Sequence, residues 1–374
     1  MNMEECRIIC IIGTRPEAIK MAPVIHLLRK EQWAQCIVVA TAQHRKMLDQ
    51  ELSVLGICPD IDLDIMTPDQ SLSELTAKLI KRTDDILVEY RPDAVLAQGD
   101  TTSVLSVALA CYYRNISFGH IEAGLRTGDF KNPFPEEFNR FVSSKVARWH
   151  FAPTEHARQN LIGEQIDPDT IYVTGNTVID ALLNAARNDG LSKKPARDDK
   201  KVIVVTVHRR ESFGEPLKRI CHAILRLAEQ YDGIRFVTPV HPNPNVASVI
   251  HEILGSHPRI ELCEPMDYLS FVSLLKASYL IISDSGGLQE EGPALGKPVL
   301  VLREKTERPE ALEAGVIKLV GTEIEKIVYE TQMLIDDPKV YRNLAKGISP
   351  YGDGHAAERI TAILKRDLYS ETGT

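Results

Sequence analysis

The sequence predicts an α/β fold class with two doubly wound, Rossmann-like domains that face a central cleft. Short apolar, β-branched runs alternate with longer helical patterns along all 374 residues, and each half of the chain holds one set of such runs. Continuous apolar strands separated by helices are typical of parallel sheets with both faces covered. The length agrees, because a chain of this size exceeds one ordinary core.

Each half supplies six expected strands. In the first half they are residues 7–12, 36–41, 94–97, 117–121, 149–152 and 171–174. In the second half they are residues 201–207, 235–240, 259–263, 279–283, 298–302 and 316–320.

The domain limits follow from changes in this pattern. Residues 184–200 become polar and aperiodic, which predicts the join between the two sets of strands. We assign residues 1–175 to an N-terminal Rossmann-like domain and residues 176–355 to a C-terminal one. Residues 356–374 then form a final amphipathic helical segment.

The amino-acid composition limits the classes of partner that the protein can have. The hydrophobic fraction of 44% and charged fraction of 26% are those of a soluble globular protein, and the net charge is −8. Such a charge argues against nucleic acid or an anionic membrane as a partner of the whole protein. The seven cysteines are scattered and form no Cys-x-x-Cys pair, which predicts reduced core residues in a cytoplasmic protein. The apolar run 8–12 is too short for a signal peptide or membrane span.

Several cofactor motifs are missing from the sequence. No Gly-x-Gly-x-x-Gly follows the first expected strand, and neither a Walker A sequence nor a His-Glu-x-x-His pair occurs. We therefore expect no nicotinamide cofactor, no nucleotide triphosphate hydrolysis and no metal.

The most informative segment is residues 281–291, where an apolar run ends in Ser285-Gly286-Gly287. Small residues at a helix start let backbone N–H groups and the helix dipole bind a phosphate. Glu290 and Glu291, one turn later, would accept ribose hydroxyls. The alternative is an ordinary strand-to-helix turn capped by Ser285.

Cations accompany two expected helix starts. Arg15 precedes Pro16, with Lys20 one turn further on, and together they would hold a diphosphate. A solvated helix start paired with Glu17 is the alternative. Arg308 would reach the same nucleotide, unless it forms a surface ion pair with Glu304 or Glu310.

Carboxylates follow two expected strands and occupy one loop of the first half. Asp100 follows Gln98-Gly99, where the alternative is a helix N-cap. Glu122 ends an apolar strand. Glu136 or Glu137 lies in a Pro-bracketed loop, where surface solvation competes with function. Acids that converge in one cleft raise each other's pKa, which suits proton transfer.

Two histidines follow expected strands of the second half. His208 ends the run 202–207 and is a candidate acid or charge stabiliser, with a buried, satisfied histidine as the alternative. His241 precedes Pro242 and carries the same alternatives. Polar residues at the carboxyl ends of parallel strands mark the usual ligand edge, so both halves predict a site there.

Ordered blocks along nearly the whole chain resemble the non-hydrolysing UDP-N-acetylglucosamine 2-epimerases, bacterial enzymes that interconvert UDP-GlcNAc and UDP-ManNAc. The blocks are residues 13–23, 99–102, 120–128, 133–137, 208–211, 283–291 and 307–310. The resemblance implies a GT-B-like fold, a final helix that packs on the first domain, a homodimer, and a cytoplasmic isomerase of cell-surface polysaccharide biosynthesis. It implies no cofactor.

The resemblance also implies site residues. The catalytic set would be Asp100, Glu122, Glu136 and His208. Nucleotide and substrate contacts would be Arg15, Lys20, His241, Ser285, Gly286, Gly287, Glu291 and Arg308, with Phe271 beside the uracil. Some members bind a second UDP-GlcNAc as an activator, near the positions of Gln43, Gln70, Arg210 and His241. Lys46 and Asp69 depart from the activated pattern, which leaves activation open.

The chemistry expected of such a site is elimination. The hydrogen on carbon 2 of the sugar is too weakly acidic to remove directly, but departure of UDP from carbon 1 makes it removable. A 2-acetamidoglucal then takes a proton on the opposite face, and UDP adds back. The alternatives are a hydrolysing epimerase that releases ManNAc and UDP, a GT-B glycosyltransferase, and a silent sugar-nucleotide sensor.

Overall fold

The computed structural model describes residues 5–41, 45–67, 70–131, 133–187 and 200–369, with only the backbone for residues 45–47. The chain forms two compact units, of which the first is discontinuous. Unit 1 comprises Met1–Leu183 and Tyr351–Thr374, and unit 2 comprises Asn184–Pro350. These limits differ from the expected domain ends at residues 175 and 355. The reason is that the segment just before unit 2 and the segment just after it hydrogen-bond to each other within unit 1. Residues 188–199 of the expected join lie outside the described residues.

A parallel sheet with the order β3-β2-β1-β4-β5-β6-β7 forms the centre of unit 1. Its strands are β1 Cys6–Ile12, β2 Ala34–Ala40, β3 Ile61–Asp62, β4 Ala94–Gln98, β5 Ser117–Ile121, β6 Trp149–Ala152 and β7 Ile171–Val173. The helices are α1 Arg15–Leu28, α2 Arg45–Val54, α3 Leu72–Tyr90, α4 Thr102–Arg114, α5 Glu136–Val146, α6 Glu155–Gly163, α7 Thr177–Arg187 and α15 Ala356–Leu364. A 3-10 turn covers Pro168–Thr170, and a π-helical turn, Lys365–Tyr369, follows α15.

The strand β1 is buried on both faces, which explains its unbroken apolar run. Ile8, Cys10 and Ile12 belong to a core shared with α1 and α15, whereas Ile9 and Ile11 belong to the core shared with α3 and α4. Side chains alternate across a strand, so one continuous run serves both cores.

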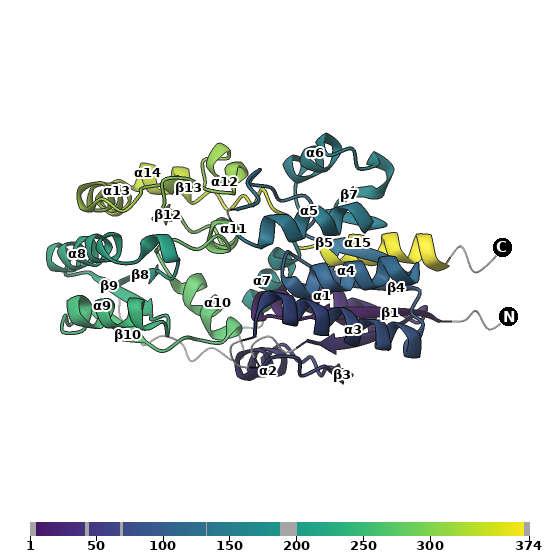
Figure 1. The fold of residues 1–374 in the computed structure, drawn as a ribbon. Helices are drawn as coiled ribbons and strands as arrows, with labels where there is room; N and C mark the ends of the chain where they lie inside the picture. Colours follow the sequence, from purple (N-terminus) through teal and green to yellow (C-terminus); the bar gives the residue numbers. More distant parts are fainter. Residues whose placement is uncertain (1–4, 42–44, 68–69, 132, 188–199, 370–374) are drawn as a thin grey trace. The chain divides into compact units, whose positions relative to one another are not determined.

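The helix α15 packs on α1, and Figure 1 shows it in yellow among the purple and blue elements of unit 1. Its Ile360 and Leu364 are fully buried in the core that β1 shares with α1 and α15. Beyond the helix, Asp367 accepts a hydrogen bond from Trp149 Nε1 at 2.8 Å. The C-terminal segment is therefore part of the first unit's core.

Unit 2 has a parallel sheet of its own, in the order β10-β9-β8-β11-β12-β13. Its strands are β8 Lys201–Thr206, β9 Ile234–Pro239, β10 Ile260–Cys263, β11 Leu280–Ser283, β12 Val299–Val301 and β13 Ile317–Leu319. The helices are α8 Glu215–Gln230, α9 Pro244–Leu254, α10 Tyr268–Ala277, α11 Leu288–Ala294, α12 Pro309–Glu313, α13 Ile324–Asp336 and α14 Pro338–Leu344, with a 3-10 turn at Arg210–Ser212.

Both units reverse their winding once, which confirms the doubly wound fold class. In unit 1 the strand β1 pairs with both β2 and β4, and in unit 2 the strand β8 pairs with both β9 and β11. Open parallel sheets bind ligands beside the carboxyl ends of the strands at such a reversal. In the described part of the chain no helix is both long and apolar enough to cross a membrane.

Candidate active site

Glu122 lies at the carboxyl end of β5 and is held by donors from three other segments. Its side chain is nearly buried, and its backbone takes a left-handed φ of 65°. Oε1 accepts from Lys20 Nζ at 2.5 Å and from Asn176 Nδ2 at 2.9 Å, and Oε2 accepts from Gln98 Nε2. Such donors suit an ionised carboxylate.

The turn after Glu122 requires glycine at position 124. Gly124 has a φ of 90°, and a Cβ there would lie 2.3 Å from the carbonyl oxygen of Ala157. The Ala123-Gly124 pair thus lets the chain turn against α6 directly after the carboxylate.

Asp100 follows β4 and pairs with Arg140 of α5, whose Nη1 donates to Oδ2 at 2.8 Å. The N-cap interpretation is wrong for Asp100, because Thr101 caps α4 instead. Burial raises the pKa of Asp100, and the charges of Glu122 and Glu136 raise it further, whereas Arg140 and Lys20 oppose the rise. Two other candidate carboxylates of unit 1, Glu122 and Glu136, are therefore close enough to Asp100 to act on it electrostatically.

Glu136 and its neighbour Glu137 have different roles in the fold. Glu137 is buried, accepts from the backbone N–H groups of Thr127 and Gly128 at 3.0 and 2.9 Å, and pairs with Arg140. Glu136 begins α5, and its buried Oε2 has no hydrogen-bond partner among the described residues. A buried unsatisfied oxygen is rare in native proteins, so Glu136 is the better candidate for contact with a ligand.

The two cations of α1 face acids in this structure. Arg15 Nε pairs with the buried Glu51 at 2.6 Å, and Lys20 pairs with Glu122. Glu17, the alternative ion-pair partner expected at this helix start, instead holds the loops at the sheet reversal: its Oε2 accepts from the backbone N–H of Thr14 at 2.9 Å. A phosphate at this helix start would have to compete with these carboxylates.

His120 is a buried residue of β5 that the sequence analysis did not single out. Its Nε2 bonds the carbonyl oxygen of Gly99 at 2.7 Å, and its Nδ1 has no partner within the described ranges. Burial lowers the pKa of His120 to about 4, so the ring is neutral at pH 7. Gln98, Arg140 and Asn176 were also missed, although Gln98 and Asn176 follow the same strand-end pattern as Glu122.

In unit 2, the fully buried Asp284 organises the loop after β8. It accepts from the backbone N–H groups of His208 and Arg209, at 3.1 and 3.0 Å, and from Ser212 Oγ at 2.9 Å. His208 Nδ1 lies 3.1 Å from Asp284 Oδ1. Burial raises the pKa of Asp284, but His208, Arg209 and Ser212 together lower it below its ordinary value.

His208 is 41% exposed, so the buried-histidine interpretation is wrong for this residue. Its ring stacks on His241 with centroids 6.0 Å apart. Burial lowers the pKa of His241, and the neighbouring His208 lowers it further. Asp284 therefore orients one ring of an exposed pair.

The Ser285-Gly286-Gly287 segment lies between β11 and α11, where Ser285 does not cap the helix. The N-cap position is Gly287, without a side-chain hydrogen bond. A Cβ on Gly286 would lie 3.2 Å from Arg209 Nη2 and 3.4 Å from Arg308 Cζ. Backbone N–H groups beside two guanidinium groups make this segment suitable for an anion.

Acidic residues balance the guanidinium groups of unit 2. Arg308 Nε pairs with Glu290 Oε1 at 2.7 Å, while Tyr268 donates its hydroxyl to Glu291 at 2.9 Å. Burial would raise the pKa of Glu307, but the hydrogen bond from Arg303, with the charges of Arg209, Arg303 and Arg308, lowers it to about 2. Glu307 is therefore negatively charged at neutral pH, beside these arginines.

The remaining candidates take no part in the contacts described above. Phe271 is partly buried on α10, and Arg210 is exposed in the 3-10 turn after His208. Gln70 accepts from Thr67 N at 3.3 Å, and its buried Nε2 has no partner in the described part of the chain. Gln43 and Asp69 lie outside the described residues, and the side chain of Lys46 is not described.

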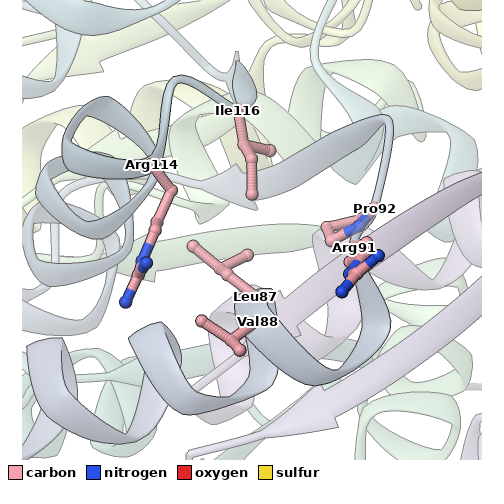
Figure 2. A pocket seen from close by; sticks show the side chains of 6 residues that line it. All are labelled: Leu87, Val88, Arg91, Pro92, Arg114 and Ile116. Atoms are coloured by element: carbon pink, nitrogen blue, oxygen red, sulfur yellow. The ribbon is translucent and has the colours of Figure 1, made fainter.

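A surface hollow of about 370 Å³ lies elsewhere, at the amino edge of the unit 1 sheet. Figure 2 shows its lining, which comes from the ends of α3 and α4 and the segments before β4 and β5: Leu87, Val88, Arg91, Pro92, Arg114 and Ile116. It contains none of the candidate site residues.

Sequence comparison finds one family throughout the chain. A family model described as UDP-N-acetylglucosamine 2-epimerase matches residues 26–365. The UDP-N-acetylglucosamine 2-epimerase of Escherichia coli K12 is 48% identical over 374 residues, covering 97% of this chain and 100% of that relative.

Structural comparison agrees. The UDP-GlcNAc 2-epimerase of Neisseria meningitidis, solved bound to UDP-GlcNAc, has a TM-score of 0.91 at 47% identity, with 96% of this chain and 100% of that chain covered. The S. aureus MnaA–UDP structure has a TM-score of 0.90 at 46% identity, with 97% of each chain covered. A glycosyltransferase from Rickettsia africae, 16% identical with a TM-score of 0.60 and 97% and 98% covered, shares the fold, which supports a GT-B-like architecture.

Proposed function

The chain belongs to the UDP-N-acetylglucosamine 2-epimerase family, and on this premise we propose that it interconverts UDP-GlcNAc and UDP-ManNAc without releasing free sugar. One observation carries the proposal: the charges of Glu122 and Glu136 both act on Asp100, and the buried Glu136 Oε2 has no hydrogen-bond partner among the residues that the structure describes. Such a group of acids suits proton transfer rather than glycosyl transfer to an acceptor.

We propose that unit 2 binds the UDP moiety. The diphosphate would lie at Ser285-Gly286-Gly287, where the guanidinium groups of Arg209 and Arg308 flank Gly286. These groups would stabilise the charge that develops as UDP leaves carbon 1. His208, oriented by Asp284, would assist the leaving group or its return. Phe271 and His241 remain proposed contacts of the nucleotide.

We propose that unit 1 carries out the proton transfers. Departure of UDP leaves positive charge at the anomeric carbon, which makes the hydrogen on carbon 2 removable by a carboxylate. The 2-acetamidoglucal then receives a proton on the opposite face, and UDP adds back. Two acid/base groups are needed around the ring, and Asp100, Glu122 and Glu136 supply them. Asp100, with its raised pKa, is suited to carry a proton.

The test is incubation with UDP-GlcNAc in deuterated water. The proposal expects UDP-ManNAc that carries deuterium at carbon 2. A hydrolysing epimerase would release free ManNAc and UDP. A glycosyltransferase or a nucleotide-sugar sensor would leave carbon 2 unlabelled, and that result would overturn the proposal.

We also propose a homodimer, as the resemblance implied. The helices α3 and α4 pack on one another and carry exposed apolar side chains: Leu72 at the start of α3, Val88 near its end, and Tyr112 and Tyr113 near the end of α4. Light scattering should give twice the chain mass, and Tyr113→Glu should shift the protein towards the monomer. A wild-type monomer at micromolar concentration would contradict this. Activation by a second UDP-GlcNAc and a cytoplasmic location stay predictions.

A further inference from the structure

We propose that Asn176 is a positioning residue for the carboxylate of Glu122, an inference that rests on the proposed epimerase function. The Asn176 side chain is buried, and its Nδ2 donates to Glu122 Oε1 at 2.9 Å. Asn176 itself has no acid/base chemistry. It acts on the reaction through the orientation of Glu122.

The orientation of the Asn176 amide is fixed by a second hydrogen bond. Its Oδ1 accepts from the backbone N–H of Val178 at 3.1 Å, in the first turn of α7. An amide has its acceptor on one side and its donors on the other. Because Oδ1 is committed to Val178, the NH₂ group faces Glu122.

The backbone of Asn176 is anchored at the point where the chain re-enters unit 1. Its N–H donates to the carbonyl oxygen of Tyr351 at 2.6 Å, and Tyr351 is the first residue of unit 1 after unit 2. The two segments pack backbone to backbone, since a Cβ on Gly175 would lie 3.3 Å from Gly352 Cα. Asn176 therefore connects Tyr351, where the chain returns to unit 1, directly to the Glu122 carboxylate.

The other groups around Glu122 show what Asn176 adds. Lys20 of α1 shares Oε1 with Asn176, and Gln98 of β4 holds Oε2. Asp100, after β4, contributes a like charge, and His120, on β5 itself, is neutral at pH 7. Lys20, which shares Oε1 with Asn176, has a flexible stem that fixes a charge but not the plane of a carboxylate.

The decisive variant is Asn176→Asp. It keeps an acceptor for Val178 N–H and nearly the same shape, but it places a second carboxylate against Glu122 Oε1. Like charges at this distance raise the pKa of the pair by about one unit or more. A base works only when ionised, so the acid limb of kcat should move to higher pH, while UDP binding stays unchanged.

Two readouts test this. In protein labelled with ¹³C at glutamate carboxyls, the titration midpoint of Glu122 should rise in the variant. In deuterated water, kcat for exchange at carbon 2 should fall on the order of 100-fold at neutral pH, with KM nearly unchanged, because a misplaced reacting group costs about that much. The serine side chain of Asn176→Ser is too short to reach Glu122. This variant should lower kcat without moving the acid limb of the kcat profile to higher pH.

Asp180→Asn is the matched control. Asp180 caps α15 by accepting from the backbone N–H groups of Ala356 and Ala357, at 3.2 and 2.9 Å, so this variant loosens the same junction without touching Glu122. It should lower thermal stability and leave the Glu122 titration in place.

The proposal is overturned if Asn176→Asp leaves both the Glu122 midpoint and the kcat profile as in wild type. It is also overturned if both Asn176 variants fail to fold while Asp180→Asn folds, because the role is then structural. If wild-type protein shows no exchange at all, the proposed function fails, and the carboxyl titration still decides the role of Asn176.

Discussion

The carboxylate of Glu17 joins the loop after β1 to the loop after β4 through Thr101. Its Oε1 accepts the Thr101 hydroxyl at 2.6 Å, while Oε2 accepts the backbone N–H groups of Gly13 and Thr14. A Cβ on Gly13 would lie 2.7 Å from Thr41 Oγ1, so the loop closes tightly over this contact. The two loops that flank the sheet reversal are thus held by one buried side chain.

Glu17 should make the stability of unit 1 depend on pH. Burial raises its pKa from 4.5 to about 7, although the hydrogen bonds from Thr101, Gly13 and Thr14 oppose the rise. The folded state therefore holds the proton more tightly than the unfolded state. Stability should fall as pH rises from about 4.5 to about 7, by about 3 kcal/mol in total.

Glu17→Gln should flatten this slope, because the amide oxygen can accept the two N–H groups while its NH₂ donates to Thr101. The measurement is the free energy of unfolding in urea at pH 5, 6, 7 and 8. An unchanged slope in the variant would show that another group is responsible.

Glu122→Gln should abolish deuterium exchange at carbon 2, with a loss of about 10³-fold or more, as expected for an acid/base group. UDP binding, measured by calorimetry, should persist, because we assign that binding to unit 2. Full residual exchange would remove Glu122 from the catalytic set.

Glu136 and Glu137 form a matched pair of neighbours. Glu136→Gln should eliminate most of the activity without loss of stability, because its Oε2 has no partner to lose in the described structure. Glu137→Gln should instead cost about 1–3 kcal/mol of stability, because it disturbs a buried group that holds two backbone N–H groups and Arg140. Thermal unfolding and exchange assays on both variants decide this, and the reverse pattern would exchange their roles.

Gly286→Ala should weaken UDP binding by about tenfold, or about 1.4 kcal/mol, because its Cβ would push apart the guanidinium groups of Arg209 and Arg308. Gly233→Ala is the control, since a Cβ there meets nothing within 4 Å. Equal affinities for UDP in the two variants would argue against an anion at this position.

The fold was predictable because most of its strands are continuous apolar runs, and β1 shows the reason, since it is buried by a core on each face. The strand β3 was missed, since two residues, Ile61 and Asp62, are too few for any periodic signal. The resemblance implied that the final helix packs on the first domain, as α15 does. The exact limits of unit 1 escaped prediction, because the contacts of Asn176 and Asp180 with residues 351–357 leave no local pattern in the sequence.

The place of a candidate side chain was predictable where it comes within two residues of a strand end, as Asp100 and Glu122 do. The pairing of side chains that are far apart in the sequence was not predictable. Lys20 was assigned to a diphosphate, yet its observed partner is Glu122, 102 residues away. Gln98 and Asn176 also come at strand ends, but their hydrogen bonds to Glu122 exist only in the folded chain. The bond from His120 to the Gly99 carbonyl likewise leaves no signal in the sequence.

The packing of α15 on α1 has a consequence for biosynthesis. Because residues 356–369 complete the core that β1 shares with α1, that core cannot close until nearly all of the polypeptide has been translated. A nascent chain stalled before residue 356 should expose the apolar surface of α1, and so attract chaperones, even though every strand of its sheet has already emerged.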